Sequence, residues 1–315
     1  MEKYKKWIYV VLLAFLFFEV LVVFPNKVGV SKDGADALDS QNSKKINTPG
    51  QKMQGVHLVE KDWELFSESA EDQQGKSVWN LKNVRVLFYK EEKLQFTVTG
   101  DQGAIDSATK DLQIRGRVNT QSENGYVFKT HIIRYSSQKK IITGPEHVEV
   151  LGPIVSGQRT ITFNGDDLVA FVDENKMVVQ KNIQAEKKLN DGKTIKITSD
   201  QIELSTLHQK VDFIGQVHMY YDQIKIDGPM ATFNFIEKNA SLDSIFVQGG
   251  AQVSDHEKVA TSKTLNFNVL KNEMTFLGQP KVVQNDDVLS GEEIIFIDGG
   301  KKVKVQNVKA TLEKK

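Results

Sequence analysis

The chain of 315 residues contains no cysteine. This absence excludes disulfide bonds, thiol catalysis, lipoprotein acylation and every zinc site built on thiolate ligands. The chain also has no surplus of either charge, because 41 Lys and Arg residues balance 41 Asp and Glu residues, and it has no basic stripe with interleaved aromatic residues. We therefore expect no binding of nucleic acid.

Motifs for catalysis are missing as well. Two Gly-Lys-Ser/Thr triplets, at 75–77 and 192–194, imitate the end of a phosphate-binding loop, but Ala70 and Lys187 stand where its first glycine belongs. No G-x-S-x-G elbow occurs, and no two of the six histidines have the H-x-x-x-H spacing of a metal site. The Asp-Asp doublets are interpreted as turn residues, because neighbouring residues on a strand point to opposite faces. We predict no catalytic residues, no metal site and no cofactor.

One long hydrophobic run is present, WIYVVLLAFLFFEVLVVF at residues 7–24. As a helix it would extend about 27 Å, close to the ~30 Å of a bilayer's hydrocarbon core. A cleaved signal peptide is the alternative, but no small-x-small cleavage site follows the run, so we predict an uncleaved transmembrane helix. Lys3, Lys5 and Lys6 predict that residues 1–6 form a cytoplasmic tail, with the body of the chain across the membrane.

The predicted helix contains one carboxylate, Glu19. Because a charge in lipid is costly, Glu19 either contacts another membrane helix or lies near the outer interface and reaches water. Both interpretations stay open. The residues that follow, 25–52, are rich in Ser, Asp, Asn, Lys and Gly, which predicts a flexible linker.

Beyond the linker, short strand-forming stretches are separated by Gly, Asn and Asp. In one recurring phrase, alternating apolar residues surround a central Gly or Asn, as in VDFIGQV at residues 211–217. The central residues of the eight copies are Asn83, Gly116, Gly144, Asn182, Gly215, Gly249, Gly278 and Asn307, so consecutive copies are 28 to 38 residues apart. A second phrase with a small polar break lies between the copies, and each unit is expected to hold about three strands.

Alternation of this kind gives each strand one buried and one wet face. A single unit cannot bury its apolar face, whereas stacked units can. A central Gly or Asn suits a corner at which a strand bends between two sheets. We predict an all-β fold, a rolled solenoid of antiparallel strands with two facing inner walls. The copy at Asn182 is weak, so a junction between two jellyrolls is expected within residues 152–195. Whether there are one or two jellyrolls stays open.

The two phrases resemble the OstA-like β-jellyroll of the lipopolysaccharide-export bridge proteins. Residues 53–157 are similar to LptC, the inner-membrane family of that machine, and residues 158–315 are similar to LptA, the soluble bridge family. The points of similarity to LptC are the cytoplasmic tail, the transmembrane helix, Trp79, the stretch GYVFKT at 125–130 with Ile133 and Tyr135, and Gly152-Pro153 followed by Gly157. The chain is longer than LptC, as if the anchored protein were extended by a length of bridge.

The resemblance implies a non-enzymatic carrier in the inner membrane, with a cytoplasmic N-terminus and a periplasmic body. Such a carrier accepts lipopolysaccharide from an ABC transporter and passes it along a trough towards the outer membrane. The implied partners are lipopolysaccharide, the permeases of the transporter, and another jellyroll protein or a second copy joined by edge strands. The alternative is a scaffold of an envelope complex that carries no lipid.

Inward apolar residues would shield acyl chains from water, with each buried methylene contributing about 0.8 kcal/mol. An ordinary core is the competing interpretation, because it requires the same alternation. The residues predicted to line the trough are Phe96, Val98, Phe128, Ile133, Tyr135, Ile197, Ile202, Leu204, Phe213, Ile226, Phe233 and Phe235.

Overall fold

The protein is described from a computed structural model. The structure describes residues 51–311 apart from 74–75, 156, 190, 206–209, 237–240, 286 and 308. The predicted tail, the predicted transmembrane helix with Glu19 and nearly all of the predicted linker lie outside these residues. Among the residues described, no helix is long and apolar enough to cross a membrane. They belong to a compact unit that spans Pro49–Lys315.

The described residues form strands joined by turns. The strands are β1 (Lys52–Val59), β2 (Trp63–Asp72), β3 (Val78–Lys90), β4 (Lys93–Asp106), β5 (Leu112–Ser122), β6 (Val127–Ser136), β7 (Ile141–Leu151), β8 (Ile154–Val155), β9 (Gln158–Arg159), β10 (Thr162–Phe171), β11 (Lys176–Lys188), β12 (Thr194–Ser199), β13 (Gln201–Ser205), β14 (Lys210–Tyr221), β15 (Ile224–Phe235), β16 (Leu242–Ser254), β17 (Lys258–Asn268), β18 (Glu273–Leu277), β19 (Lys281–Gln284), β20 (Asp287–Ser290), β21 (Glu293–Ile297), β22 (Lys302–Gln306) and β23 (Lys309–Thr311).

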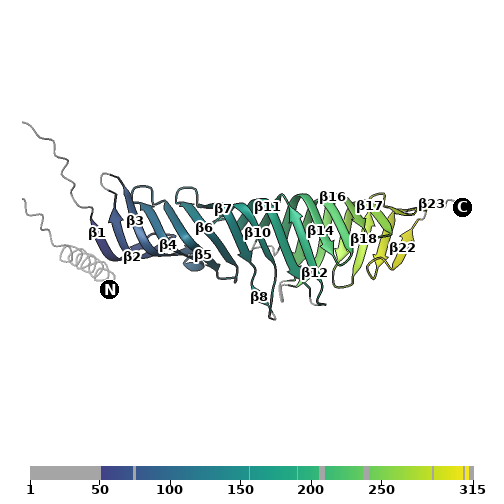
Figure 1. Cartoon of the computed structure of the whole chain (residues 1–315), viewed down its shortest axis with the longest axis horizontal. Coiled ribbons are helices and arrows are strands. Elements are labelled where there is room, and N and C mark those ends of the chain that lie inside the picture. The colour runs from purple at the N-terminus through teal and green to yellow at the C-terminus, as the bar shows by residue number, and fades with distance from the viewer. Residues whose placement is uncertain are drawn as a thin grey trace, which may run out of the picture. The chain divides into compact units, whose positions relative to one another are not determined.

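Every strand pairing is antiparallel, and most strands pair with the next in the sequence, so the labelled strands follow one another in chain order in Figure 1. Some long strands pair with two short ones. Strand β11, for example, pairs with β12 through residues 183–188 and with β13 through residues 176–179. The short β8–β9 hairpin protrudes from the connection between β7 and β10 (Figure 1). The predicted all-β, antiparallel roll is confirmed.

The repeated Gly and Asn residues mark a corner at which the long strands bend. Pairing shifts register near the middle of several long strands, including the β4–β5, β5–β6, β14–β15 and β16–β17 pairs. Seven of the eight central residues have a positive φ, a backbone conformation that residues other than Gly and Asn rarely adopt. Gly144 is the exception, and there Asp167 on the paired strand has the positive φ. The corner prediction is confirmed, although many units hold two long bent strands where three short ones were expected.

Polar side chains on the outer side of the corner repeat with the same spacing. In each pair a carboxylate accepts a hydrogen bond from an amide or guanidinium group 15 or 16 residues later. The pairs are Glu68–Asn83, Asp101–Arg117, Asp166–Asn182, Asp200–Gln216 and Glu292–Asn307. The repeat therefore extends to the side chains that cover the bend.

Turns alternate between the two ends of the long strands. We call the end with the β1–β2, β3–β4, β5–β6, β11–β12 and β16–β17 turns the first rim, and the end with the β4–β5, β6–β7, β10–β11 and β21–β22 turns the second rim. Lysines join the two rims along a line that we call the seam. The contacts are Lys110–Glu60 (3.1 Å), Lys140–Asp62, Lys90 Nζ to the carbonyl of Asp173 (2.7 Å), and Lys258 Nζ to the carbonyl of Gly300 (3.0 Å). The sheet is thus folded at the corner and closed along the seam.

The interior holds two clusters of buried apolar side chains. The first cluster runs from Trp63 to Ile142, and the second runs from Val148 to Phe296. Hydrogen bonding nevertheless continues from β6 through β7, β10 and β11 without a break in the sheet. The backbone is therefore one continuous roll, whereas the core is divided.

Candidate functional site

A cavity of about 560 Å³ lies at the place where the two clusters meet. Its volume is in the range of about 300–1,000 Å³ that is typical of ligand sites. Ile133 and Ile142 of the first cluster line it together with Leu168, Met177 and Leu204 of the second. The division of the core therefore leaves an apolar space inside a continuous sheet.

The walls come from both halves of the folded sheet. Strands β4, β5 and β6 contribute Phe96, Thr120 and Phe128 near the first rim. Strands β10 and β11 contribute Ala170 and Met177 near the second rim. Period-2 alternation places these residues inward, because their neighbours on each strand face the other side. The cavity is therefore lined by apolar side chains on two opposite sides.

The mouth of the cavity lies on the seam and carries polar residues. Lys93 and Glu123 border it on the first rim, and Lys176 borders it on the second. The ammonium of Lys176 lies 2.7 Å from the carboxylate of Glu203. An amphiphile with its chains in the cavity would therefore leave its polar part among charged side chains at the seam.

Next to this mouth the seam is held shut. Asp62 of the β1–β2 turn binds Lys140 of the β6–β7 turn. Burial acts to lower the pKa of Lys140, but the hydrogen bond from Lys140 to Asp62 and nearby charges outweigh it, so that this pKa is raised. Lys140 therefore remains a cation, and the contact across the seam remains an ion pair.

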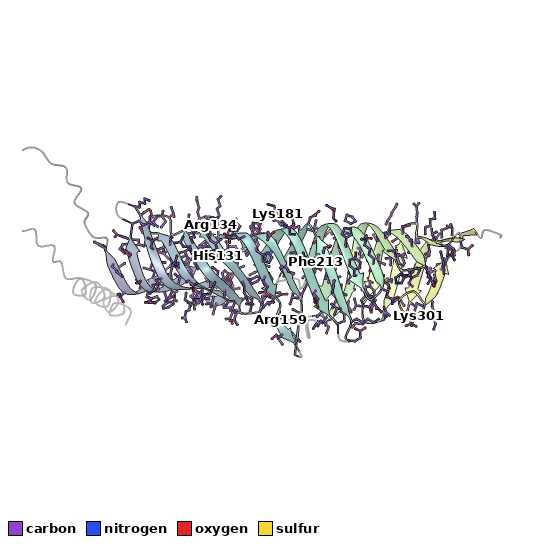
Figure 2. The ribbon with its side chains drawn as sticks, in the orientation of Figure 1. His131, Arg134, Arg159, Lys181, Phe213 and Lys301 are labelled. Carbon is purple, nitrogen blue, oxygen red and sulfur yellow. The ribbon has the colours of Figure 1, made fainter. Side chains whose placement is uncertain are left out.

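The structure separates the predicted trough residues into two groups. Four of them line the cavity, namely Phe96, Phe128, Ile133 and Leu204. Seven others are at most 3% exposed and do not line it, namely Val98, Tyr135, Ile197, Ile202, Phe213, Ile226 and Phe233. The remaining residue, Phe235, is partly buried and packs at the margin of the second cluster. Phe213, which is labelled in Figure 2, packs edge to face on Phe233 with ring centroids 5.0 Å apart.

Several lining residues escaped the sequence prediction. Tyr126 packs parallel to Phe128 with ring centroids 6.2 Å apart, and burial raises the pKa of its hydroxyl. Ala170 and Met177 could have been found by continuing the alternation of Leu168 and Val179 to the ends of their strands. Their place in the same cavity as Phe128 could not, because it depends on how the two rims meet.

Lys187 is a buried charged residue to which the sequence analysis assigned no role. It lies on β11 in the same inward row as Ile183 and Ala185, and it is 6% exposed. Burial lowers the pKa of its ammonium.

In the part of the chain that the structure describes, no group of three or more His, Cys, Asp or Glu residues could hold a metal ion.

Two protein families match separate parts of the chain. Residues 11–158 match the family described as lipopolysaccharide-assembly, LptC-related. Residues 196–299 match the family described as LptA/(LptD N-terminal domain) LPS transport protein. No curated protein matches the chain.

Among solved structures, the chain is similar to LptH from Pseudomonas aeruginosa. LptH is described as the LptA homologous periplasmic component of the conserved lipopolysaccharide transport device. The two share 16% identity over 38% of this chain and 95% of that chain, with a TM-score of 0.35. Independently of that likeness, the LptC-related match over residues 11–158 and the LptA/LptD N-terminal match over residues 196–299 together support an LptC-like protein of the lipopolysaccharide transport bridge.

Proposed function

We propose that this chain carries lipopolysaccharide with the acyl chains inside the rolled sheet and the polar part outside, across the seam. The single observation that carries the proposal is the apolar cavity that opens on the seam between Phe128 and Met177. Each methylene that moves from water into such a space contributes about 0.8 kcal/mol to the binding free energy. The burial of one acyl chain, with its many methylenes, therefore favours binding of the lipid. The body is periplasmic in this proposal, and residues 7–24 anchor it in the inner membrane.

Permeases of an inner-membrane ABC transporter are the proposed donors of the lipid. Another jellyroll is the proposed acceptor, joined by strand addition at an open sheet edge. Strand β1 supports such a contact because, in the described part of the chain, it pairs only with β2 and keeps Met53 and Val59 exposed. At the other end, β22 pairs only with β21 among the described strands.

A scaffold that carries no lipid is the second candidate for the C-terminal part. It is favoured by the dense interior there, since Phe213, Phe233, Phe267 and Phe276 are all 0% exposed. In the carrier proposal this interior must separate when lipid arrives, with the two walls parting at the seam. The two candidates therefore differ in whether lipid enters beyond the cavity.

A cavity-filling substitution tests the carrier proposal. Ala170 faces the cavity, whereas Val169 beside it does not line that cavity. We expect the full chain in lipid nanodiscs to bind lipopolysaccharide, Ala170→Trp to lose most of the binding, and Val169→Trp to retain it, as measured by native mass spectrometry. Binding by Ala170→Trp equal to that of the unaltered chain would reject the cavity as the site. No binding by the unaltered chain would reject the carrier function.

A further inference from the structure

A groove of about 400 Å³ lies on the outer face of the roll and shares no lining residue with the cavity. Its floor is formed by five neighbouring strands, β7, β10, β11, β12 and β14. The strand pairings place one lining residue from each strand in a single row, namely Leu151, Thr162, Glu186, Lys196 and Tyr220. Since neighbouring strands are about 4.8 Å apart, this row is about 19 Å long. The groove therefore suits a chain-like ligand.

One end of the groove carries an outward-facing aromatic ring, that of Tyr220. Tyr220 is 49% exposed, whereas every other Phe, Tyr or Trp side chain that the structure describes is buried or half-buried. The neighbours of Tyr220 on β14, Met219 and Tyr221, point inward and are 0% and 1% exposed. An aromatic face left in water beside a groove is a platform on which a flat apolar surface can pack.

The rest of the groove is rich in amide and hydroxyl groups. A second row across the strands consists of Glu149, Asn164, Gln184 and Thr198. The side chains of Asn164, Gln184 and Thr198 have no hydrogen-bond partner among the atoms that the structure describes. On the same face, by contrast, His218 lies 2.5 Å from Asp227. Amides and hydroxyls both donate and accept hydrogen bonds, so this row matches a ligand whose own groups do both.

The charges of the groove do not select a charged ligand. Glu186 and Lys196 lie opposite each other in the β11–β12 pairing and have opposite signs. The carboxylate of Glu149 lies 3.0 Å from the ammonium of Lys129. No surplus of positive charge is therefore left in the groove to bind phosphate groups, which favours an uncharged ligand.

The two family matches do not account for this groove. Thr162, Asn164, Gln184 and Glu186 lie in residues 159–195, between the match to residues 11–158 and the match to residues 196–299. The groove is thus formed largely by the segment that joins the two matched parts of the chain.

We propose that this groove binds an uncharged saccharide chain, with one sugar ring packed against Tyr220 and the adjoining rings hydrogen-bonded to Asn164, Gln184 and Thr198. A sugar ring has an apolar face of C–H groups, which an aromatic ring can cover, and a rim of hydroxyls that donate and accept hydrogen bonds. The carbohydrate part of lipopolysaccharide and the glycan of the cell wall share this chemistry. The proposal does not depend on the lipid cavity, which lies inside the roll.

The experiment titrates the full chain, in nanodiscs free of lipopolysaccharide, with two lipid-free probes. One probe is the polysaccharide released from lipopolysaccharide by mild acid, and the other is an N-acetylglucosamine oligomer, which represents the cell-wall glycan. Saturation-transfer NMR measures the binding of each probe. Tyr220→Ala removes the aromatic ring, Tyr220→Phe keeps it, and Gln184→Ala removes one amide. Gln252→Ala is the matched control, because Gln252 is an exposed glutamine on β16 that does not line the groove.

We expect the unaltered chain to bind at least one probe, and the probe that binds more tightly identifies the source of the saccharide. Tyr220→Ala should weaken that binding about tenfold. Gln184→Ala should weaken it about threefold. Tyr220→Phe and Gln252→Ala should bind as the unaltered chain does. Because Tyr220 and Gln184 are exposed and do not line the cavity, both lining variants should keep their melting temperature and their binding of lipid.

Two results would overturn the proposal. One is that the unaltered chain binds neither probe, and the other is that Tyr220→Ala or Gln184→Ala binds the saccharide as tightly as the unaltered chain. Native mass spectrometry of the lipid complex in the same variants reports separately on the carrier function. Saccharide binding can thus fail while lipid binding persists, and lipid binding can fail while saccharide binding persists.

Discussion

Truncating Phe213 in the closed core should mainly lower the free energy of unfolding, whereas truncating Phe128 in the cavity wall should mainly lower the affinity for lipid. Phe213 is 0% exposed and packs edge to face on Phe233, so Phe213→Ala leaves a void that the surrounding strands fill only in part. Such a truncation costs about 3–5 kcal/mol of unfolding free energy. Phe128 is half-buried and borders a space that already exists. Since fully burying a Phe side chain is worth about 1.5–3 kcal/mol, Phe128→Ala should cost only about 1 kcal/mol.

Lipid binding should show the reverse order. Phe128→Ala removes a large part of the apolar wall, so its affinity for lipopolysaccharide should fall although the fold is nearly unchanged. The assays are guanidinium unfolding of the full chain, followed by far-ultraviolet circular dichroism, and native mass spectrometry of the lipid complex at a temperature where both variants are folded. Equal losses of stability in the two variants would refute the distinction between an open cavity and a closed core.

Two further predictions concern the seam and the corner. Asp62→Asn weakens the partly buried ion pair with Lys140, so the unfolding free energy should fall by about 1 kcal/mol and amide exchange in the β6–β7 turn should accelerate. Unchanged exchange in that turn would show that the ion pair does not hold the rims together. Gly215→Ala should cost more than about 1–2 kcal/mol, because a Cβ atom at this left-handed position would lie 2.4 Å from the carboxylate of Asp200. Gly192→Ala, which is also left-handed but has no atom within 4 Å, should cost less, and thermal melts of the two variants that coincide would contradict this account.

Much of the fold could be predicted from the sequence because it is encoded locally. The alternation around Phe213 sets which face is buried, and Gly215 sets where the strand bends, since its φ of 76° suits few other residues. The number of strands in each unit was predicted less well. The apolar phrases on the two sides of a bend look like separate strands in the sequence, whereas the backbone continues through the bend in β14 as one strand.

The candidate site was predicted only in part because it depends on contacts between distant segments. Phe128 and Val98 have the same alternating pattern, yet Phe128 lines the cavity and Val98 is 0% exposed in the first cluster. The difference arises where β6 meets β10 and β11 across the interior, which no local pattern records. The burial of Lys187 could have been predicted from the row of Ile183 and Ala185. A lysine at the end of an apolar row is, however, easily taken for an exposed strand end.

The most direct test of the central claim is photocrosslinking from inside and outside the roll. A photoreactive phenylalanine analogue is placed at Phe128, which lines the cavity, or at Lys129, which is exposed beside it and pairs with Glu149 at 3.0 Å. With the full chain in nanodiscs that contain lipopolysaccharide, the account predicts a strong lipid crosslink from position 128 and little or none from position 129. Equal crosslinking from both positions, or none from position 128 in a folded protein, would contradict transport through the interior.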